Sequence, residues 1–298
     1  MSRDELLRSR LDRFTRMLHG VDAGAIRAVH RARVASRRLR ELLPLLQLDA
    51  GVTEKLSHRL RRATRRLGTV RELDVLIELT EELHQSGGYP DRALRQVATE
   101  VRQARAEAFG KLLGKRAGTE LRRIARKLEK VERQIRGAGH RETTGRAWRW
   151  AMDARVARRA ATAKRAIEDA GSLYLPERLH VARIAVKKLR YGMELVADAV
   201  GGARGGDLRT LKREQTLLGR MHDLQVLIGR ARRVQARLVP SDAIVSRDLD
   251  SLVVALDADC RRLHARYVRD RAKLLDICRR LAASTPAAAR AHVIRRVG

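Results

Sequence analysis

The sequence predicts an all-α protein that folds around a packed core. Its composition is rich in alanine, leucine, arginine and glutamate, which are typical of long helices, and glycine and proline punctuate the helical stretches. Hydrophobic residues make up 44% of the 298 residues, enough for a core even though 34% are charged. Two motifs also occur once in each half of the chain, which indicates an internal duplication.

The apolar spacing and the glycine and proline breaks predict the helices in order. In the first half we expect helices over residues 2–18, 23–48, 52–67, 69–86, 91–113 and 119–136. In the second half we expect helices over residues 147–170, 175–200, 206–218, 220–238 and 241–284. The stretch GAGHRETTG between the halves interrupts the pattern. We therefore expect an N-terminal repeat at 1–138, a linker at 139–145 and a C-terminal repeat at 146–298, together forming one domain.

The duplication is carried by two motifs at nearly constant offset. The first is VHRARVASRRLR at 29–40, which returns 150 residues later as LHVARIAVKKLR with six of twelve positions identical. The second is LGTVRELDVL at 67–76, which returns 151 residues later as LGRMHDLQVL with five of ten positions identical. Compositional bias alone would not preserve the order and the distance of both motifs.

The second motif is interpreted as a helix end followed by a helix start. Gly68 is expected to terminate the basic helix before it, because glycine suits the position after a helix C-terminus. Glu72 and Asp74 would then lie near the first turn of the next helix, where acids suit the helix dipole. In the second copy Asp223 repeats the Glu72 position, and Gln225 replaces Asp74.

The first motif places a row of cations along one helix. At about 100° per residue, one arc of roughly 80° collects the side chains of His30, Arg33, Arg37 and Arg40. The second copy repeats this row with His180, Arg183, Lys187 and Arg190. We call these rows the first and the second ridge. Each runs about 15 Å, long enough to meet several successive anionic groups.

The basic helix before the second motif extends each ridge onto a neighbouring helix. The first extension consists of His58, Arg62, Arg65 and Arg66, and the second of Arg209, Lys212 and Arg213. The equivalent residues Arg71 and His222 are placed either to reach a ligand or to pair with neighbouring acids. The two halves are not equally basic, because the second copy has Thr216 and Leu217 in place of two arginines.

The charge balance points to a polyanionic partner. Lysine and arginine number 66 against 35 acids, for a formal net charge of +31, and such self-repulsion destabilises a compact state unless an anion offsets it. A solvated helix face is the alternative, but few acids are interleaved on the ridges to make i,i+4 pairs. His30 and His180 are interpreted as phosphate donors, as structural histidines, or as metal ligands or phosphorylated nucleophiles. Arginine neighbours repel metals and no CxxC or HExxH occurs, so we expect no metal, no cofactor and no catalytic residue.

These motifs resemble the CHAD family, the conserved histidine α-helical domain, over essentially the whole chain. The residues that carry the resemblance are His30, Arg33, Arg37, Arg38 and Arg40, then His180, Arg183, Lys187, Lys188, Arg190 and Tyr191, each set with its second motif. The resemblance implies two pseudo-symmetric four-helix bundles with a basic central groove or channel that binds inorganic polyphosphate. It also implies association with polyphosphate granules. The expected function is therefore non-enzymatic polyphosphate binding.

Three other classes of function are alternatives to polyphosphate binding. A general nucleic-acid-binding protein is the main alternative, because electrostatic attraction to backbone phosphates does not depend on the base sequence. Against it, aromatic residues make up only 3% of the chain and no helix-turn-helix, finger or RNP signature occurs. An enzyme acting on polyphosphate would need a P-loop or a carboxylate cluster. Membrane adhesion would need an unburied apolar helix face. No run of about 18 apolar residues and no signal peptide occurs, so we expect a cytoplasmic protein.

Overall fold

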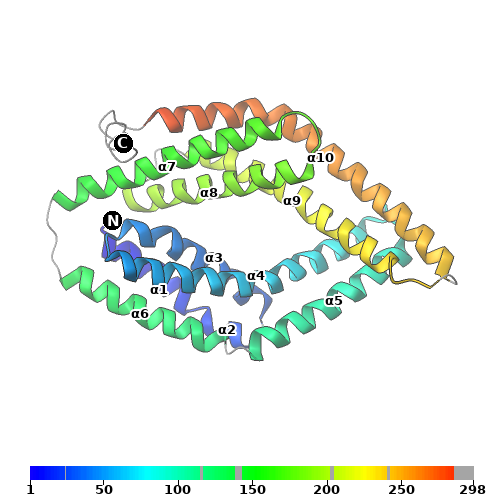
Figure 1. Cartoon of the computed structure of the whole chain (residues 1–298), viewed down its shortest axis with the longest axis horizontal. Helices are drawn as coiled ribbons and strands as arrows, with labels where there is room; N and C mark the ends of the chain where they lie inside the picture. The colour runs from blue at the N-terminus through cyan, green and yellow to red at the C-terminus, as the bar shows by residue number, and fades with distance from the viewer. Residues whose placement is uncertain (24, 115–116, 138–142, 202–204, 240–241, 285–298) are drawn as a thin grey trace. The chain divides into compact units, whose positions relative to one another are not determined.

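The computed structural model describes residues 1–23, 25–114, 117–137, 143–201, 205–239 and 242–284. In these ranges every regular element is helical and no strand occurs, which confirms the all-α prediction (Figure 1). The first half contains α1 (Arg3–Thr15), α2 (Leu18–Asp22), α3 (Ile26–Leu42), the short 3₁₀ helix η1 (Leu43–Leu45), α4 (Ala50–Ser86), α5 (Asp91–Gly114) and α6 (Ala117–Gly137). The second half contains α7 (Thr143–Ala170), α8 (Pro176–Val200), α9 (Gly205–Gln235) and α10 (Ala243–Ala283).

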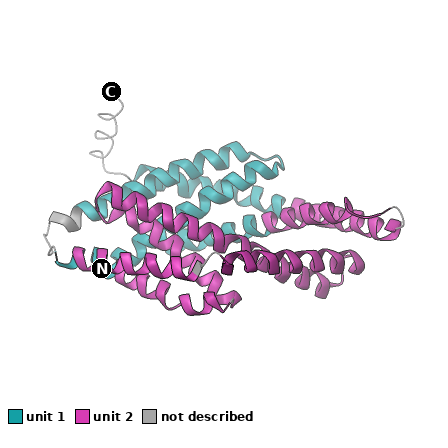
Figure 2. Ribbon diagram, turned by 60° about the horizontal axis from the view of Figure 1, so that its bottom comes forward, with its two compact units in different colours: residues 1–6, 135–220, 263–298 teal, residues 7–134, 221–262 magenta. Residues whose placement is uncertain are grey.

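The chain forms two compact units (Figure 2). Unit 1 consists of residues 1–6, 135–220 and 263–298, and unit 2 of residues 7–134 and 221–262, so that α9 and α10 contribute to both units. Within unit 2, α3 packs on α4 and α4 packs on α5; within unit 1, α7 packs on α8. The predicted linker lies largely outside the described residues, and the predicted repeat boundaries and the pairing of the bundles stay predictions.

The helix break predicted at the second motif is wrong in both copies. Helix α4 continues without interruption through Gly68, and α9 continues through Gly219. A glycine inside a helix costs only about 1 kcal/mol relative to alanine, and the buried residues Leu67 and Val70 on either side anchor α4 in the core. Because no helix starts here, Asp74 does not serve a first turn; it is buried and pairs with Arg105 of α5 at 3.0 Å.

Two other boundaries differ from the sequence prediction. The helix expected over residues 2–18 ends at Thr15, and after a turn at residues 16–17 the short helix α2 covers residues 18–22, most of which were expected to lie between helices. The helix expected over residues 23–48 ends at Leu42 and passes into η1. Pro44 explains this end, because it has no backbone N–H to continue the α-helical hydrogen bonds.

Local signals fix the ends of the long helix α4. Its N-terminal cap is Asp49, whose Oδ1 accepts a hydrogen bond from the backbone N–H of Val52 at 3.1 Å. Its C-terminal cap is Gly87, whose φ of 70° is the left-handed conformation that favours glycine. Helix α4 is 37 residues long and therefore runs past α3 along the whole first ridge.

Each ridge helix buries one face and carries its cations on the neighbouring face. Helix α3 buries Val29, Ala32, Ala35, Leu39 and Leu42, and α8 buries Leu179, Ala182, Ala185, Val186 and Leu189. These apolar residues recur every three or four positions, so they form a single stripe on each helix. The cationic residues of both ridges are thereby directed away from the core of their own unit.

Candidate functional site

In unit 2 the first ridge lies along the seam between α3 and α4. Arg33 of α3 reaches across to Gly68 of α4, where a Cβ atom would lie only 3.2 Å from the Arg33 Nε atom and 3.6 Å from Nη2. The missing side chain at residue 68 therefore leaves the space that the guanidinium group occupies. The glycine that the sequence analysis assigned to a helix end instead positions a ridge arginine.

His30 lies at an electropositive point of this seam. The residue is exposed, yet its pKa is lowered from the ordinary value of 6.5. Partial burial of the ring is the largest cause, the positive charges of Arg71 and Arg33 add to it, and Glu78 acts in the opposite direction. The ring is therefore neutral at pH 7 and carries one N–H that can donate to an anion.

A second group of cations meets further along the same seam. The pKa of Arg40 is lowered, mainly by burial; Glu41 opposes this change, and the charges of Arg37 and Arg61 reinforce it. Arg61 lies on α4, and the sequence analysis did not single it out. The sequence did contain an indication of it, because Arg61 lies in the basic segment before the second motif that also contains Arg62, Arg65 and Arg66. Like charges thus crowd both ends of the first ridge.

The predicted extension on α4 is largely engaged by acids. Arg62 donates from Nε at 3.0 Å and from Nη2 at 2.6 Å to one oxygen of Glu120 of α6, and Arg66 pairs with the other oxygen. Arg71 forms a two-pronged pair with Glu78, at 2.9 and 3.2 Å. His58 and Arg65 are exposed. On α4 the seam therefore holds charges of both signs, whereas the ridge residues that α3 contributes to it are all of basic type.

In unit 1 the second ridge occupies α8 in the same way. Its residues His180, Arg183, Lys187 and Arg190 are half-buried and Lys188 is exposed. Arg190 has structural partners: its Nε donates to Gln215 at 2.7 Å, it pairs with Glu194, and its guanidinium carbon lies 4.6 Å from the centroid of the Tyr191 ring. His180, Arg183 and Lys187 are the second-ridge counterparts of His30, Arg33 and Arg37.

The extension of the second ridge lies on α9. Arg209 and Lys212 are exposed. Arg213 donates from Nε to Glu214 at 2.9 Å and approaches Asp270 of α10 at 3.6 Å. Glu214 is fully buried, and burial is the largest cause that raises its pKa above 4.5. His222 lies on the part of α9 that belongs to unit 2.

The structure adds arginines that the sequence analysis did not name. Arg10, Arg13 and Arg16 of the α1 region line a cavity together with residues of α3. Arg10 is buried, and its Nη1 donates to the backbone carbonyl of Arg38 at 2.9 Å. These arginines are spaced three residues apart, which indicates that they lie on the same face of a helix. Only the packing of α1 beside α3 shows that this face and His30 line the same cavity.

Across the described residues, no cluster of three or more histidine, cysteine or acidic side chains could hold a metal ion. Within the same part of the chain, none of the helices combines the length and the apolar character needed to cross a membrane.

Comparison with known proteins agrees with this architecture. The crystal structure of the CHAD domain from the plant Ricinus communis is similar with a TM-score of 0.54 and 21% identity, covering 95% of this chain and 91% of that one. PptA from Streptomyces chartreusis is similar with a TM-score of 0.56 and 18% identity, covering 95% and 97%. No curated protein matches significantly. The profile of the CHAD domain matches residues 5–232, and with its ridge histidines on α3 and α8 the chain belongs to the CHAD domain family.

Proposed function

We propose that this protein binds inorganic polyphosphate without turning it over. The observation that carries the proposal is the convergence of His30, Arg33 and Arg71 at the α3–α4 seam, where burial of the ring is the largest cause that lowers the pKa of the histidine and the charges of the two arginines lower it further. Such mutual repulsion costs free energy in the unliganded protein, and a polyanion offsets it. Membership of the CHAD domain family supports the same ligand.

The length of the seam fits a chain of phosphates better than a single one. From His30 to Arg40 the first ridge rises through ten residue steps, or about 15 Å of helix, with clusters of basic residues at both ends. Arginine suits this ligand because its planar fork donates two parallel hydrogen bonds to phosphate oxygens. From the family resemblance we also propose that the second ridge, on α8, joins the first ridge in lining one basic groove.

The proposal of binding without catalysis rests on the surroundings of His30. Activation of an imidazole as a nucleophile or base requires an acid that orients the ring. Glu78 is the acid whose charge reaches His30, and both of its oxygens are already held by Arg71. His30 is therefore proposed as a hydrogen-bond donor to phosphate. Release of orthophosphate on incubation with polyphosphate and magnesium would contradict this assignment.

The test compares two matched double variants. Arg33→Gln/Arg37→Gln removes two first-ridge cations, whereas Arg92→Gln/Arg247→Gln removes two exposed cations of α5 and α10 in the same unit. Affinity for a polyphosphate of defined length is measured at about 0.15 M salt, where surface charges are already screened. We expect at least tenfold weaker binding by the ridge variant and nearly unchanged binding by the control. Equal losses in both variants would reduce the site to a diffuse positive charge.

The same assay separates polyphosphate binding from general nucleic-acid binding. RNA and duplex DNA are offered at matched phosphate concentration, since the electrostatic term alone does not distinguish them. We expect a preference for polyphosphate that the double variant His30→Gln/His180→Gln loses. Equal affinity for all three polymers would favour the nucleic-acid alternative.

In the cell we propose a cytoplasmic location at polyphosphate granules. A fluorescent fusion is expected to colocalise with the granules, and the Arg33→Gln/Arg37→Gln variant to become diffuse. A granule signal that is unchanged in that variant would mean that another surface of the protein attaches it.

A further inference from the structure

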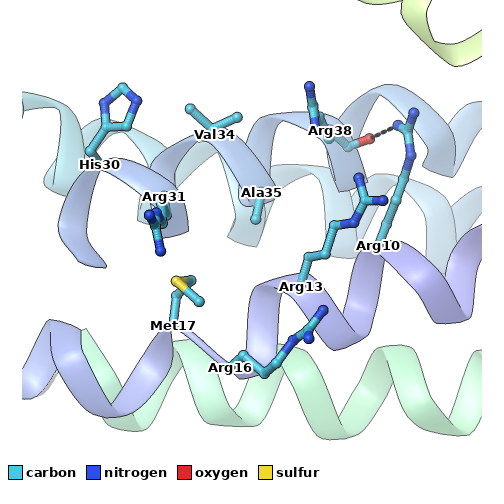
Figure 3. Close-up of a pocket in the computed structure, with 9 residues that line it drawn as sticks. All are labelled: Arg10, Arg13, Arg16, Met17, His30, Arg31, Val34, Ala35 and Arg38. Carbon is cyan, nitrogen blue, oxygen red and sulfur yellow. Dashed lines mark hydrogen bonds between the residues drawn. The ribbon is translucent and has the colours of Figure 1, made fainter. Parts of the chain in front are cut away.

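A cavity lies on the other side of α3 from the α4 seam. It has a volume of about 420 Å³ and lies within unit 2, between the α1 region and α3 (Figure 3). The basic residue types in its lining are Arg10, Arg13, Arg16, His30, Arg31 and Arg38. No acidic side chain belongs to the lining, whereas the α4 side of the seam contains paired acids.

The geometry of α3 separates this cavity from the first ridge. Relative to His30, Arg31 and Arg38 project about 80–100° to one side of the helix, while Arg33 and Arg40 project about 60–80° to the other. In Figure 3 the side chain of Arg31 points from α3 toward Met17. His30 lies between the two sides and lines the cavity as well as belonging to the ridge.

The cavity is a built site in which the protein itself holds guanidinium groups in place. Arg10 is only 4% exposed, and its Nη1 donates to the carbonyl of Arg38 at 2.9 Å. Arg16 donates from Nε to the carbonyl of Asp12 at 3.2 Å, beside the turn that separates α1 from α2. These hydrogen bonds orient two of the arginines before a ligand arrives, which lowers the entropy that binding costs.

We propose that this cavity binds the terminal phosphate groups of linear polyphosphate, while the α3–α4 seam binds interior phosphates. A terminal phosphate, like a phosphomonoester, carries a charge of about −1.5 to −2 at pH 7, whereas an interior phosphate has one ionisable oxygen fewer. A cavity lined by five arginines matches the more highly charged chain end. His30 is the residue where the two binding regions meet. This inference rests on the proposed function.

The test uses two phosphate trimers that differ in having ends. Linear tripolyphosphate has two terminal phosphates, and cyclic trimetaphosphate has none. The variant Arg13→Gln/Arg16→Gln removes two exposed arginines of the cavity, and Arg92→Gln/Arg247→Gln again serves as the control. By isothermal titration calorimetry at about 0.15 M salt, we expect the wild-type protein to bind the linear trimer at least tenfold more tightly than the cyclic one.

The cavity variant should lose most of this preference. We expect its affinity for the linear trimer to fall about tenfold, its affinity for the cyclic trimer to stay constant, and its affinity for long-chain polyphosphate to fall less than threefold. Wild-type affinity for the linear trimer, or equal losses for both trimers, would overturn the inference and leave the long-chain function intact. A wild-type protein that binds long chains but does not prefer the linear trimer would also overturn it. Failure of the wild-type protein to bind any polyphosphate would overturn the proposed function as well.

Discussion

Replacing Gly68 by alanine tests how the structure positions Arg33. The new Cβ atom would lie 3.2 Å from the Nε, 3.6 Å from the Nη2 and 3.8 Å from the Cζ atom of Arg33. Since nonbonded heavy atoms pack best at about 3.5–4.0 Å, the guanidinium group must move by roughly 0.5 Å. The second motif supplies a matched control, because a Cβ atom on Gly219 would meet nothing within 4 Å.

The two substitutions should differ in stability and in binding. Alanine in a helix interior is favoured over glycine by about 1 kcal/mol, and Gly219→Ala should gain this full amount in the free energy of unfolding. Gly68→Ala should gain less than half of it, because Arg33 is displaced from its position across α4. Polyphosphate affinity should fall about fivefold for Gly68→Ala, equivalent to about 1 kcal/mol, and should not change for Gly219→Ala.

Urea unfolding and calorimetric titration of polyphosphate at about 0.15 M salt measure the two effects. A double-mutant cycle isolates the contact: in an Arg33→Gln background, Gly68→Ala should recover the full gain of about 1 kcal/mol. If Gly68→Ala alone stabilises the protein as much as Gly219→Ala and leaves binding unchanged, the glycine does not determine the position of Arg33, and the reasoning is refuted.

Three further predictions concern titratable groups. Asp74→Ala should lower the free energy of unfolding by about 3 kcal/mol in urea unfolding, because it leaves Arg105 without its buried carboxylate partner; a loss below 1 kcal/mol would contradict this. Burial raises the pKa of Glu214, so the free energy of unfolding of the wild-type protein should fall as the pH rises from 4.5 through that raised pKa. The Glu214→Gln variant should not show this fall when unfolding curves are measured at a series of pH values. Bound phosphate favours the imidazolium form of His30, so polyphosphate affinity should increase as the pH falls below 7, and NMR titration should show a higher His30 pKa in the complex than in the free protein.

Much of the first ridge could be predicted because it depends on one helix at a time. The 3.6-residue period places His30, Arg33 and Arg37 on one face wherever α3 forms, and the apolar stripe of Val29, Ala32 and Leu39 determines which face is buried. The same reasoning gave the long helices and the all-α class. The break at Gly68 was predicted wrongly because glycine is a strong local indicator of a helix end. The burial of Leu67 and Val70, which keeps α4 continuous, depends on tertiary packing and cannot be seen in the local sequence.

The sequence by itself determined the helical class, the cationic faces of α3 and α8 and the excess positive charge, since these follow from residue order and helical geometry. Only the tertiary structure decided which cations have partners. Glu120 neutralises Arg62 and Arg66 from a different helix, and Gly68 makes room for Arg33. The α1 arginines likewise become part of a cavity only because α1 packs beside α3. Ion pairing and close packing depend on distances between helices, and the order of residues along one helix does not contain those distances.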